Sequence, residues 1–237
     1  MRECEVILKK ALNEERSSLL LNESHAICRF HGIHLPELRM VTDIDEAARQ
    51  ANEIGFPVAL KIVSPEILHK SDVGGVVLDV KDEVELRIKY TNLIEEVQRK
   101  ALNAEITGVA IEKMVPPGIE LIAGGIRDSQ FGPCVMLGIG GIFAELYDDV
   151  SFRVAPIDRT DALSLIRDLR GSRILQGTRG KHAVDLDSIV NVLMNVSKLM
   201  IEHDQISEVD LNPVIAYPDS VSAVDSRIIL RESRGAF

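Results

Sequence analysis

The fold of this chain is decided by residues 56–76, which read FPVALKIVSPEILHKSDVGGV. The apolar run 57–63 predicts a buried strand, the polar stretch after it predicts a loop, and residues 76–80 predict the partner strand. Lys61 stands inside the buried strand, and His69 stands in the loop shortly before a glycine pair. The stretch therefore predicts a strand–loop–strand unit that carries two chemically active side chains.

The segments around this stretch predict a lobe of mixed α/β structure. Apolar residues at helical spacing predict two N-terminal helices, then a strand and a helix, and a long amphipathic helix after the strand–loop–strand unit. These expected elements are helices 3–21 and 22–32, strand 39–42, and helices 43–54 and 82–102.

The pattern changes after Ala104 to closely spaced strands separated by Pro-Gly and Gly-Gly turns, which is typical of an antiparallel sheet. The expected strands cover residues 108–115, 119–127, 133–138, 151–157, 208–216 and 221–230, with helices over 161–169 and 186–202. The predicted fold class is therefore α/β with two lobes, and we place the domain boundary near residues 104–116.

The composition excludes several classes of protein. The 237 residues include 27 basic and 37 acidic side chains, which give a net charge of −10. A negative field repels nucleic acid and anionic lipid, and the three cysteines show no spacing typical of a disulfide framework or a zinc site. No apolar run is long enough to cross a bilayer, and no signal core begins the chain. We therefore expect a cytoplasmic protein with no nucleic-acid or membrane partner.

Two side chains of the decisive stretch are candidates for phosphate chemistry. An ammonium in a buried strand is costly unless an anion meets it, so Lys61 predicts an anionic neighbour, or else an edge strand whose lysine reaches water. A neutral imidazole is a nucleophile toward phosphorus, although on spacing alone the solvated turn is favoured for His69, since a loop histidine beside lysine and serine usually stands in one. The other histidines show no metal-ligand spacing and are interpreted as surface or packing residues, namely His25, His31, His34, His182 and His203.

Oxygen-bearing side chains on later strands predict a second polar site. Glu112 and Glu120 fall on successive expected strands, where a carboxylate needs donors such as ribose hydroxyls or a lysine unless it faces water. Asp210 and Asn212 share one face of a strand by the two-residue period, and Asp225 lies on the next strand. Such oxygens are typical ligands of Mg²⁺, which also holds nucleotide phosphates. The alternative is Asn-Pro turn chemistry with surface carboxylates.

Together these motifs resemble the ATP-grasp fold, in which a nucleotide binds between two lobes. The decisive stretch, followed by FGP, GIGGI, GTRG, EVDLNPV and VDSRI, is similar to the β subunit of NDP-forming acyl-CoA synthetases, relatives of succinyl-CoA synthetase. The resemblance runs from about Glu15 to Ile229, and HKSDxGGV is its most specific element. Asp128-Ser and Asp225-Ser-Arg depart from the usual Asp-Pro and Asp-Ala-Arg, but both keep the acid.

The resemblance implies a reversible reaction in which acyl-CoA, ADP and phosphate give a carboxylic acid, CoA and ATP. It implies that His69 relays a phosphoryl group to ADP, because a covalent carrier protects the group from water when two sites are apart. Mg²⁺ is the implied cofactor. The implied partner is a CoA-binding α subunit, in an α₂β₂ assembly. The sequence contains no CoA-binding Rossmann pattern, so we expect that the chain does not complete the reaction alone.

The resemblance also assigns roles to residues of this chain. The implied catalytic set is His69, Asp210 beside the phosphohistidine, and Arg153 in contact with the transferred phosphate, and the implied metal ligands are Asn212 and Asp225. The implied nucleotide-binding set is Lys61 at the phosphates with Gly74 and Gly75 nearby, Glu112, Lys113 and Met114 at the hinge beside the nucleoside, and Glu120 close to them.

Under this hypothesis residues 1–22 form an N-terminal helix, residues 23–113 a small lobe with the phosphohistidine loop, and residues 114–237 a large lobe with the metal site. Two alternatives remain open. An ATP-grasp amide ligase would attack a free acyl phosphate directly and would not use His69. A nucleotide-binding module without catalysis would bind Mg-ATP and transfer nothing.

Overall fold

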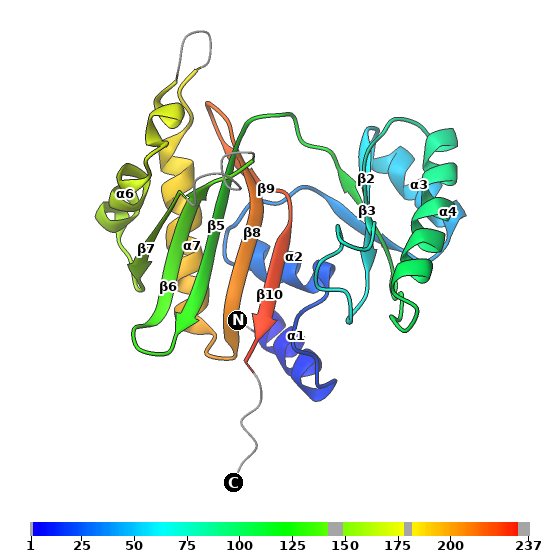
Figure 1. The fold of residues 1–237 in the computed structure, drawn as a ribbon, viewed down its shortest axis with the longest axis horizontal. Coiled ribbons are helices and arrows are strands. Elements are labelled where there is room, and N and C mark those ends of the chain that lie inside the picture. Colours follow the sequence, from blue (N-terminus) through cyan, green and yellow to red (C-terminus); the bar gives the residue numbers. More distant parts are fainter. Residues whose placement is uncertain (1, 142–148, 178–181, 232–237) are drawn as a thin grey trace. The chain divides into compact units, whose positions relative to one another are not determined.

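The computed structural model describes residues 2–141, 149–177 and 182–231, which fall into two compact units (Figure 1). The smaller unit contains residues 20–22 and 36–116. The larger unit contains the described residues of 1–19, 23–35 and 117–237. The main boundary, after residue 116, therefore lies at the end of the interval expected from the sequence.

The smaller unit is an antiparallel sheet with two helices packed on one face. Its strands lie in the order β1-β4-β2-β3. Both helices begin at an aspartate, Asp43 or Asp82, whose carboxylate accepts hydrogen bonds from amides of the first turn. The elements are β1 Leu38–Val41, α3 Ile44–Ile54, β2 Val58–Val63, β3 Val76–Val80, α4 Glu83–Lys100 and β4 Gly108–Lys113.

The larger unit is built on a second sheet, which is antiparallel throughout its described strands, as the sequence predicted. Its order is β10-β8-β5-β6-β7, with β9 also paired to β8. The elements are α1 Arg2–Asn13, α2 Leu21–Phe30, β5 Ile119–Asp128, β6 Gly132–Ile139, β7 Val150–Val154, α6 Arg159–Asp168, the 3₁₀ helix η1 Ser172–Gln176, α7 Leu186–Glu202, β8 Ile206–Ala216, β9 Val221–Ala223 and β10 Ser226–Leu230. The first two residues of α2 fall in the smaller unit.

Helix α7 packs along one face of this sheet (Figure 1). Gly125 of β5 allows the close approach, because a Cβ there would lie 2.6 Å from Cγ of Met200 on α7. Asp185 begins the helix by accepting hydrogen bonds from two amides of the first turn. One face of the sheet is therefore core, and the other face remains for polar and exposed side chains.

The N-terminal segment differs from the sequence prediction, which placed residues 23–113 together in the small lobe. Residues 23–35 belong to the larger unit, because the buried side chains of Ile27, Cys28 and Ile33 join its core. The first helix ends at Asn13 rather than continuing to residue 21. Residues 17–19 instead extend the larger sheet, where Leu19 N–H donates to Ile228 O at 3.0 Å.

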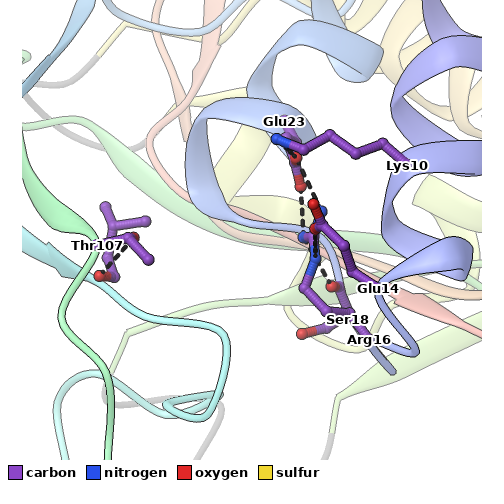
Figure 2. A network of polar contacts seen from close by, with 7 residues as sticks. Lys10, Glu14, Arg16, Ser18, Glu23 and Thr107 are labelled. Carbon is purple, nitrogen blue, oxygen red and sulfur yellow. Dashed lines mark hydrogen bonds and ion pairs between the residues drawn. The ribbon is translucent and has the colours of Figure 1, made fainter.

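A charged network holds the connection between α1 and α2 (Figure 2). The Arg16 guanidinium donates two hydrogen bonds to the Glu23 carboxylate, at 2.6 and 2.9 Å, and a third to Glu14 at 2.8 Å. Both side chains of the central pair are more than nine-tenths buried. Such a bidentate pair fixes the orientation of the two side chains as well as their distance, so it holds the connection between the two helices in place.

Within residues 2–141, 149–177 and 182–231, no helix has the length and the apolar character that a bilayer-spanning segment requires.

Candidate functional site

The smaller unit buries an ion pair in the middle of its sheet. The Lys61 ammonium on β2 lies 2.5 Å from Oε2 of Glu112 on β4, and the two side chains are only 3% and 1% exposed. Antiparallel pairing aligns Lys61 with Ala110 and Ala59 with Glu112, so the two charged residues are diagonal neighbours on one face. The anion that the sequence required for Lys61 is thus a carboxylate of the protein itself.

This ion pair lies on the sheet face opposite to the helices. Leu60 and Ile62, which alternate with Lys61, pack in the core with α3 and α4. Ala110, the direct partner of Lys61, belongs to a separate small cluster with Leu21 and Val63. The alternative of an edge-strand lysine reaching water is therefore wrong, because β2 lies between β4 and β3.

His69 is exposed in the loop between β2 and β3. The loop forms a compact turn, in which Asp72 N–H donates to His69 O at 3.2 Å and Gly75 N–H donates to Lys70 O at 2.7 Å. The imidazole is therefore presented to solvent on a hydrogen-bonded segment that begins six residues after β2.

The glycine pair after His69 has a steric reason within the smaller unit. Gly74 adopts φ +73°, a region that favours glycine. A Cβ on Gly75 would lie 2.5 Å from Cγ2 of Ile62 and 2.9 Å from Lys70 O. These positions therefore let the loop turn tightly against β2, whatever ligand the loop contacts.

Lys113 and Met114, the other expected hinge residues, are anchored to the segment before β2. The Lys113 ammonium donates to Gly55 O at 2.6 Å and to Phe56 O at 3.3 Å. Gly55 follows the last residue of α3, so this cation lies at the negative end of that helix. Met114 N–H donates to Pro57 O at 3.2 Å. Both residues therefore tie the end of β4 to the start of β2.

In the larger unit, Asp210, Asn212 and Asp225 come together on one face of the sheet. The register between β8 and β10 pairs Leu211 with Ser226 and Asp210 with Arg227, and pairing resumes at Val214 with Ala223. Between these pairs, the register puts Asn212 opposite Asp225. Asn212 follows Asp210 by two residues, so the two side chains share one face of the strand. Residues 224 and 225 interrupt the strand expected over 221–230, so β9 and β10 are separate. The register therefore puts the three residues of the predicted oxygen cluster on one face of the sheet.

Arg227 is a member of this cluster that the sequence analysis did not assign. Its guanidinium lies 3.4 Å from the Asp210 carboxylate and donates to Glu208 at 2.9 Å. The signal that could have identified it is strand alternation, which puts an arginine opposite the aspartate once the β8–β10 register is known. The larger unit therefore offers a mixed surface of two acids, an amide and a guanidinium.

Glu120 lies on β5 near the glycine cluster 138–141. Gly140 N–H donates to Glu120 O at 2.8 Å, and a Cβ on Gly141 would be 3.2 Å from Oε2 of Glu120. Glu120 alternates with Ile122 and Gly124, and Gly124 pairs with Asp210, so Glu120 shares the face of the oxygen cluster. Residue 142 of GIGGI and residues 178–180 of GTRG lie outside the described residues.

Arg153 requires a correction, because β7 carries it on the other face. Arg153 pairs with Val135 of β6, which is fully buried in the core that α7 covers. The neighbouring Phe152 pairs with Met136, which pairs with Gly124 of β5, which in turn pairs with Asp210 of β8. The face that carries Asp210 is therefore the face of Phe152 and not that of Arg153. The Arg153 guanidinium donates to Ser164 Oγ at 2.6 Å and pairs with Asp168, both on α6. Arg153 thus anchors α6 to the edge strand and is not brought together with the predicted phosphate-contacting residues.

Each unit therefore contains one group of side chains that suits ligand binding. The smaller unit holds a buried ammonium paired with a carboxylate, and the loop that follows β2 carries an exposed imidazole; these groups suit the binding and transfer of an anionic group. The larger unit holds an exposed amide, Asn212, and the half-buried carboxylates of Asp210 and Asp225, and such oxygens suit a hard cation such as Mg²⁺.

Comparisons with known proteins agree with these observations. Residues 10–230 match the family model described as an ATP-grasp domain. The β subunit of acetate–CoA ligase [ADP-forming] I from Pyrococcus furiosus is 44% identical over 224 residues, covering 94% of this chain and 96% of that protein.

Two solved structures of the dinucleotide-forming acetyl-coenzyme A synthetase 1 from Ca. Korarchaeum cryptofilum are also similar. One, with coenzyme A, acetyl-coenzyme A and a phosphorylated phosphohistidine segment, has 45% identity and a TM-score of 0.89, covering 96% of this chain and 100% of that one. The other, with coenzyme A and Mg-AMPPCP, has its phosphohistidine segment pointing towards the nucleotide binding site. It is 43% identical with a TM-score of 0.84 and the same coverage.

Proposed function

Because this chain belongs to the ATP-grasp family, among the β subunits of the ADP-forming acetate–CoA ligases, we propose that it transfers a phosphoryl group between His69 and ADP. The overall reaction converts acyl-CoA, ADP and phosphate into a carboxylic acid, CoA and ATP. In this reaction the chain supplies the nucleotide-binding half.

The observation that carries the proposal is the exposed imidazole of His69 in its ordered turn. A neutral ring nitrogen can attack phosphorus and form a phosphoramidate, and the same bond then breaks as ADP takes the phosphoryl group. The turn is closed by Gly75 N–H donating to Lys70 O. The loop can thus present the ring as one unit, and the phosphohistidine segments of the Korarchaeum structures support this assignment.

Lys61 supplies positive charge for the nucleotide phosphates. An ammonium fixed in a water-poor site stabilises developing negative charge better than one in bulk water. Glu112 holds that ammonium in place at 2.5 Å on the face away from the helices. Gly74 and Gly75 lie near the phosphates, and Lys113 and Met114 form the hinge beside the nucleoside together with Glu112.

The oxygen cluster of the larger unit fits a magnesium ion. Asn212 and Asp225 face one another across the β8–β10 register, and both offer hard oxygen donors of the kind that Mg²⁺ prefers. When bound, Mg²⁺ neutralises phosphate charge. The family resemblance assigns Asp210, which pairs with Arg227 at 3.4 Å, to the acidic position beside the phosphohistidine, and it assigns Glu120 to nucleotide binding.

The proposed partner is a CoA-binding α subunit, which holds the acyl group and CoA and delivers the phosphoryl group to His69. The name of the Pyrococcus relative as a β subunit supports such a partner. We propose an α₂β₂ assembly.

The proposal is tested by ATP synthesis from acetyl-CoA, ADP and phosphate in the presence of an α subunit from an ADP-forming acetate–CoA ligase. We expect turnover with the wild-type chain and none above background with His69→Gln, while ADP affinity stays within about threefold because the nucleotide phosphates bind at Lys61. His34→Gln, a change of another exposed histidine, is the matched control and should keep full activity. Normal turnover by His69→Gln would overturn the proposal.

A further inference from the structure

Three metal-ligating side chains meet inside the larger unit, away from the residues assigned above. Cys4 comes from the first turn of α1, His31 follows α2, and His203 follows α7. One ligand atom from each lies within 4.8 Å of the other two, and all three residues are buried. The sequence spacing concealed this cluster, because the three residues come from segments that only the fold brings together.

The His31 ring has acceptors at both of its nitrogens. Its Nδ1 lies 2.9 Å from Ile27 O, and its Nε2 lies 3.2 Å from Oε2 of Glu202. A neutral imidazole has one N–H and can donate to only one of these acceptors. Donation from Nδ1 to a backbone carbonyl is the arrangement that orients metal-ligating histidines, and it points the Nε2 lone pair toward the carboxylate. A cation beside Nε2 would satisfy both groups.

His203 also has a nitrogen that is suited to bind a metal. Its side chain is more than nine-tenths buried, and its Nε2 has no hydrogen-bond partner among the described residues. The ring meets that of His31 edge-on, with the centroids 5.1 Å apart. A buried imidazole nitrogen without a partner costs free energy, and coordination to a metal removes that cost.

A cavity borders this cluster at His203. Its volume is about 380 Å³, and it is lined by Glu5, Leu8, Lys9, Glu202, His203 and Gln205. The Glu202 carboxylate is at its wall and is partly exposed, so it can enter or leave a coordination sphere as a fourth ligand.

We propose that Cys4, His31 and His203 bind a Zn²⁺ ion, with Glu202 as the fourth ligand. One thiolate, two imidazoles and a carboxylate form a donor set that zinc accepts in tetrahedral geometry. Zinc bonds of roughly 2.0–2.3 Å require neighbouring ligand atoms about 3.3–3.7 Å apart, so modest side-chain movement from the observed separation closes the site. Mg²⁺, which demands oxygen ligands, does not compete.

Binding exchanges one proton for the metal. The Cys4 thiol loses its proton as the sulfur–zinc bond forms, and the proton is released to solvent. The ion then connects the start of α1 to the ends of α2 and α7, so it acts as a structural metal site that stabilises the N-terminal segment.

The test uses the full-length chain, stripped with a chelator and titrated with Co²⁺ as a spectroscopic substitute for Zn²⁺. We expect one equivalent of Co²⁺ to produce a sulfur-to-cobalt charge-transfer band, unchanged by excess Mg²⁺ and abolished by Zn²⁺. Cys4→Ser should lose the band, His203→Gln should weaken Co²⁺ binding at least tenfold, and the matched control Cys134→Ser should bind as the wild type does.

A second measurement needs no variant. Zn²⁺ should protect Cys4 of the wild-type chain from alkylation, as followed by peptide mass spectrometry, while Mg²⁺ should not. The proposal is overturned if the folded wild-type chain shows no thiolate band and no protection of Cys4, or if Cys4→Ser keeps the band. Absence of binding would mean that the His31 ring donates to Glu202 as an ordinary ion pair. His69 phosphorylation does not depend on either outcome.

Discussion

Replacing Lys61 with Met should separate the structural role of the buried ion pair from its nucleotide role. The substitution removes the ammonium and keeps a side chain of similar length, and it leaves Glu112, only 1% exposed, without the cation 2.5 Å away. Removing one member of a buried pair typically costs about 3–5 kcal/mol. We expect Lys61→Met to lower the free energy of unfolding by that amount.

The double variant Lys61→Met with Glu112→Leu should recover most of this loss, because a buried pair exchanged for apolar side chains of similar volume is often neutral. The matched control is Lys81→Met, in the same unit. Lys81 pairs with Asp79 at 3.3 Å, but these side chains are 68% and 60% exposed, so the expected cost is less than about 1 kcal/mol.

The assay is urea unfolding followed by far-ultraviolet circular dichroism, since the chain contains no tryptophan. ADP binding is measured by calorimetry on the same samples. The double variant should be nearly as stable as the wild type and still bind ADP at least tenfold more weakly. Equal stability losses for Lys61→Met and Lys81→Met would refute the account of the ion pair, and unchanged ADP affinity in the double variant would refute the nucleotide role of Lys61.

Three further predictions concern packing and ionisation. Gly75→Ala should destabilise the smaller unit by about 1–3 kcal/mol in urea unfolding, because its Cβ would lie 2.5 Å from Ile62; a cost near zero would contradict this. Arg16→Met should cost about 3–5 kcal/mol in the same assay, since the Glu23 carboxylate stays buried, and a loss under 1 kcal/mol (the usual limit for an exposed pair) would argue against this role of the pair. Burial raises the pKa of Cys28 from 9.0 to about 12. The thiol therefore ionises at lower pH in the unfolded chain than in the folded one, so the free energy of unfolding falls above about pH 9, by up to ~1.4 kcal/mol per pH unit. Urea unfolding near pH 8 and near pH 10 should show a smaller fall for Cys28→Ala than for the wild type, and equal falls would contradict the shift.

Local patterns in the sequence were sufficient for most elements of the fold. Helix α7 occupies the predicted residues 186–202, because its apolar period and its Asp185 cap are both local signals. The end of α1 was predicted too far along the chain, since Leu19 is apolar but pairs with β10 instead. Residues 23–35 were placed in the wrong unit because a helical period shows which face is apolar and not which core covers it.

The sequence could predict that a side chain of the candidate site needs a partner, but it could not identify a partner that comes from a distant strand. A lysine within a buried strand required an anion, but only the register shows that Glu112 provides it. Alternation places Arg153 on the face opposite to Phe152, yet which of these faces is core depends on where α7 and α6 pack. The Cys4–His31–His203 cluster left no local signal at all.

The proposed function requires that His69 carries a phosphoryl group, which labelling with γ-labelled ATP and Mg²⁺ can detect. The purified chain is incubated alone and with an α subunit, and protein-bound label that survives alkali and is lost in acid is measured, as expected for a phosphoramidate. We expect such label on the wild-type chain and on His34→Gln, and none on His69→Gln. No label on the wild type even with the α subunit, or full label on His69→Gln, would contradict the proposed function and favour a direct ligase or a silent binding module.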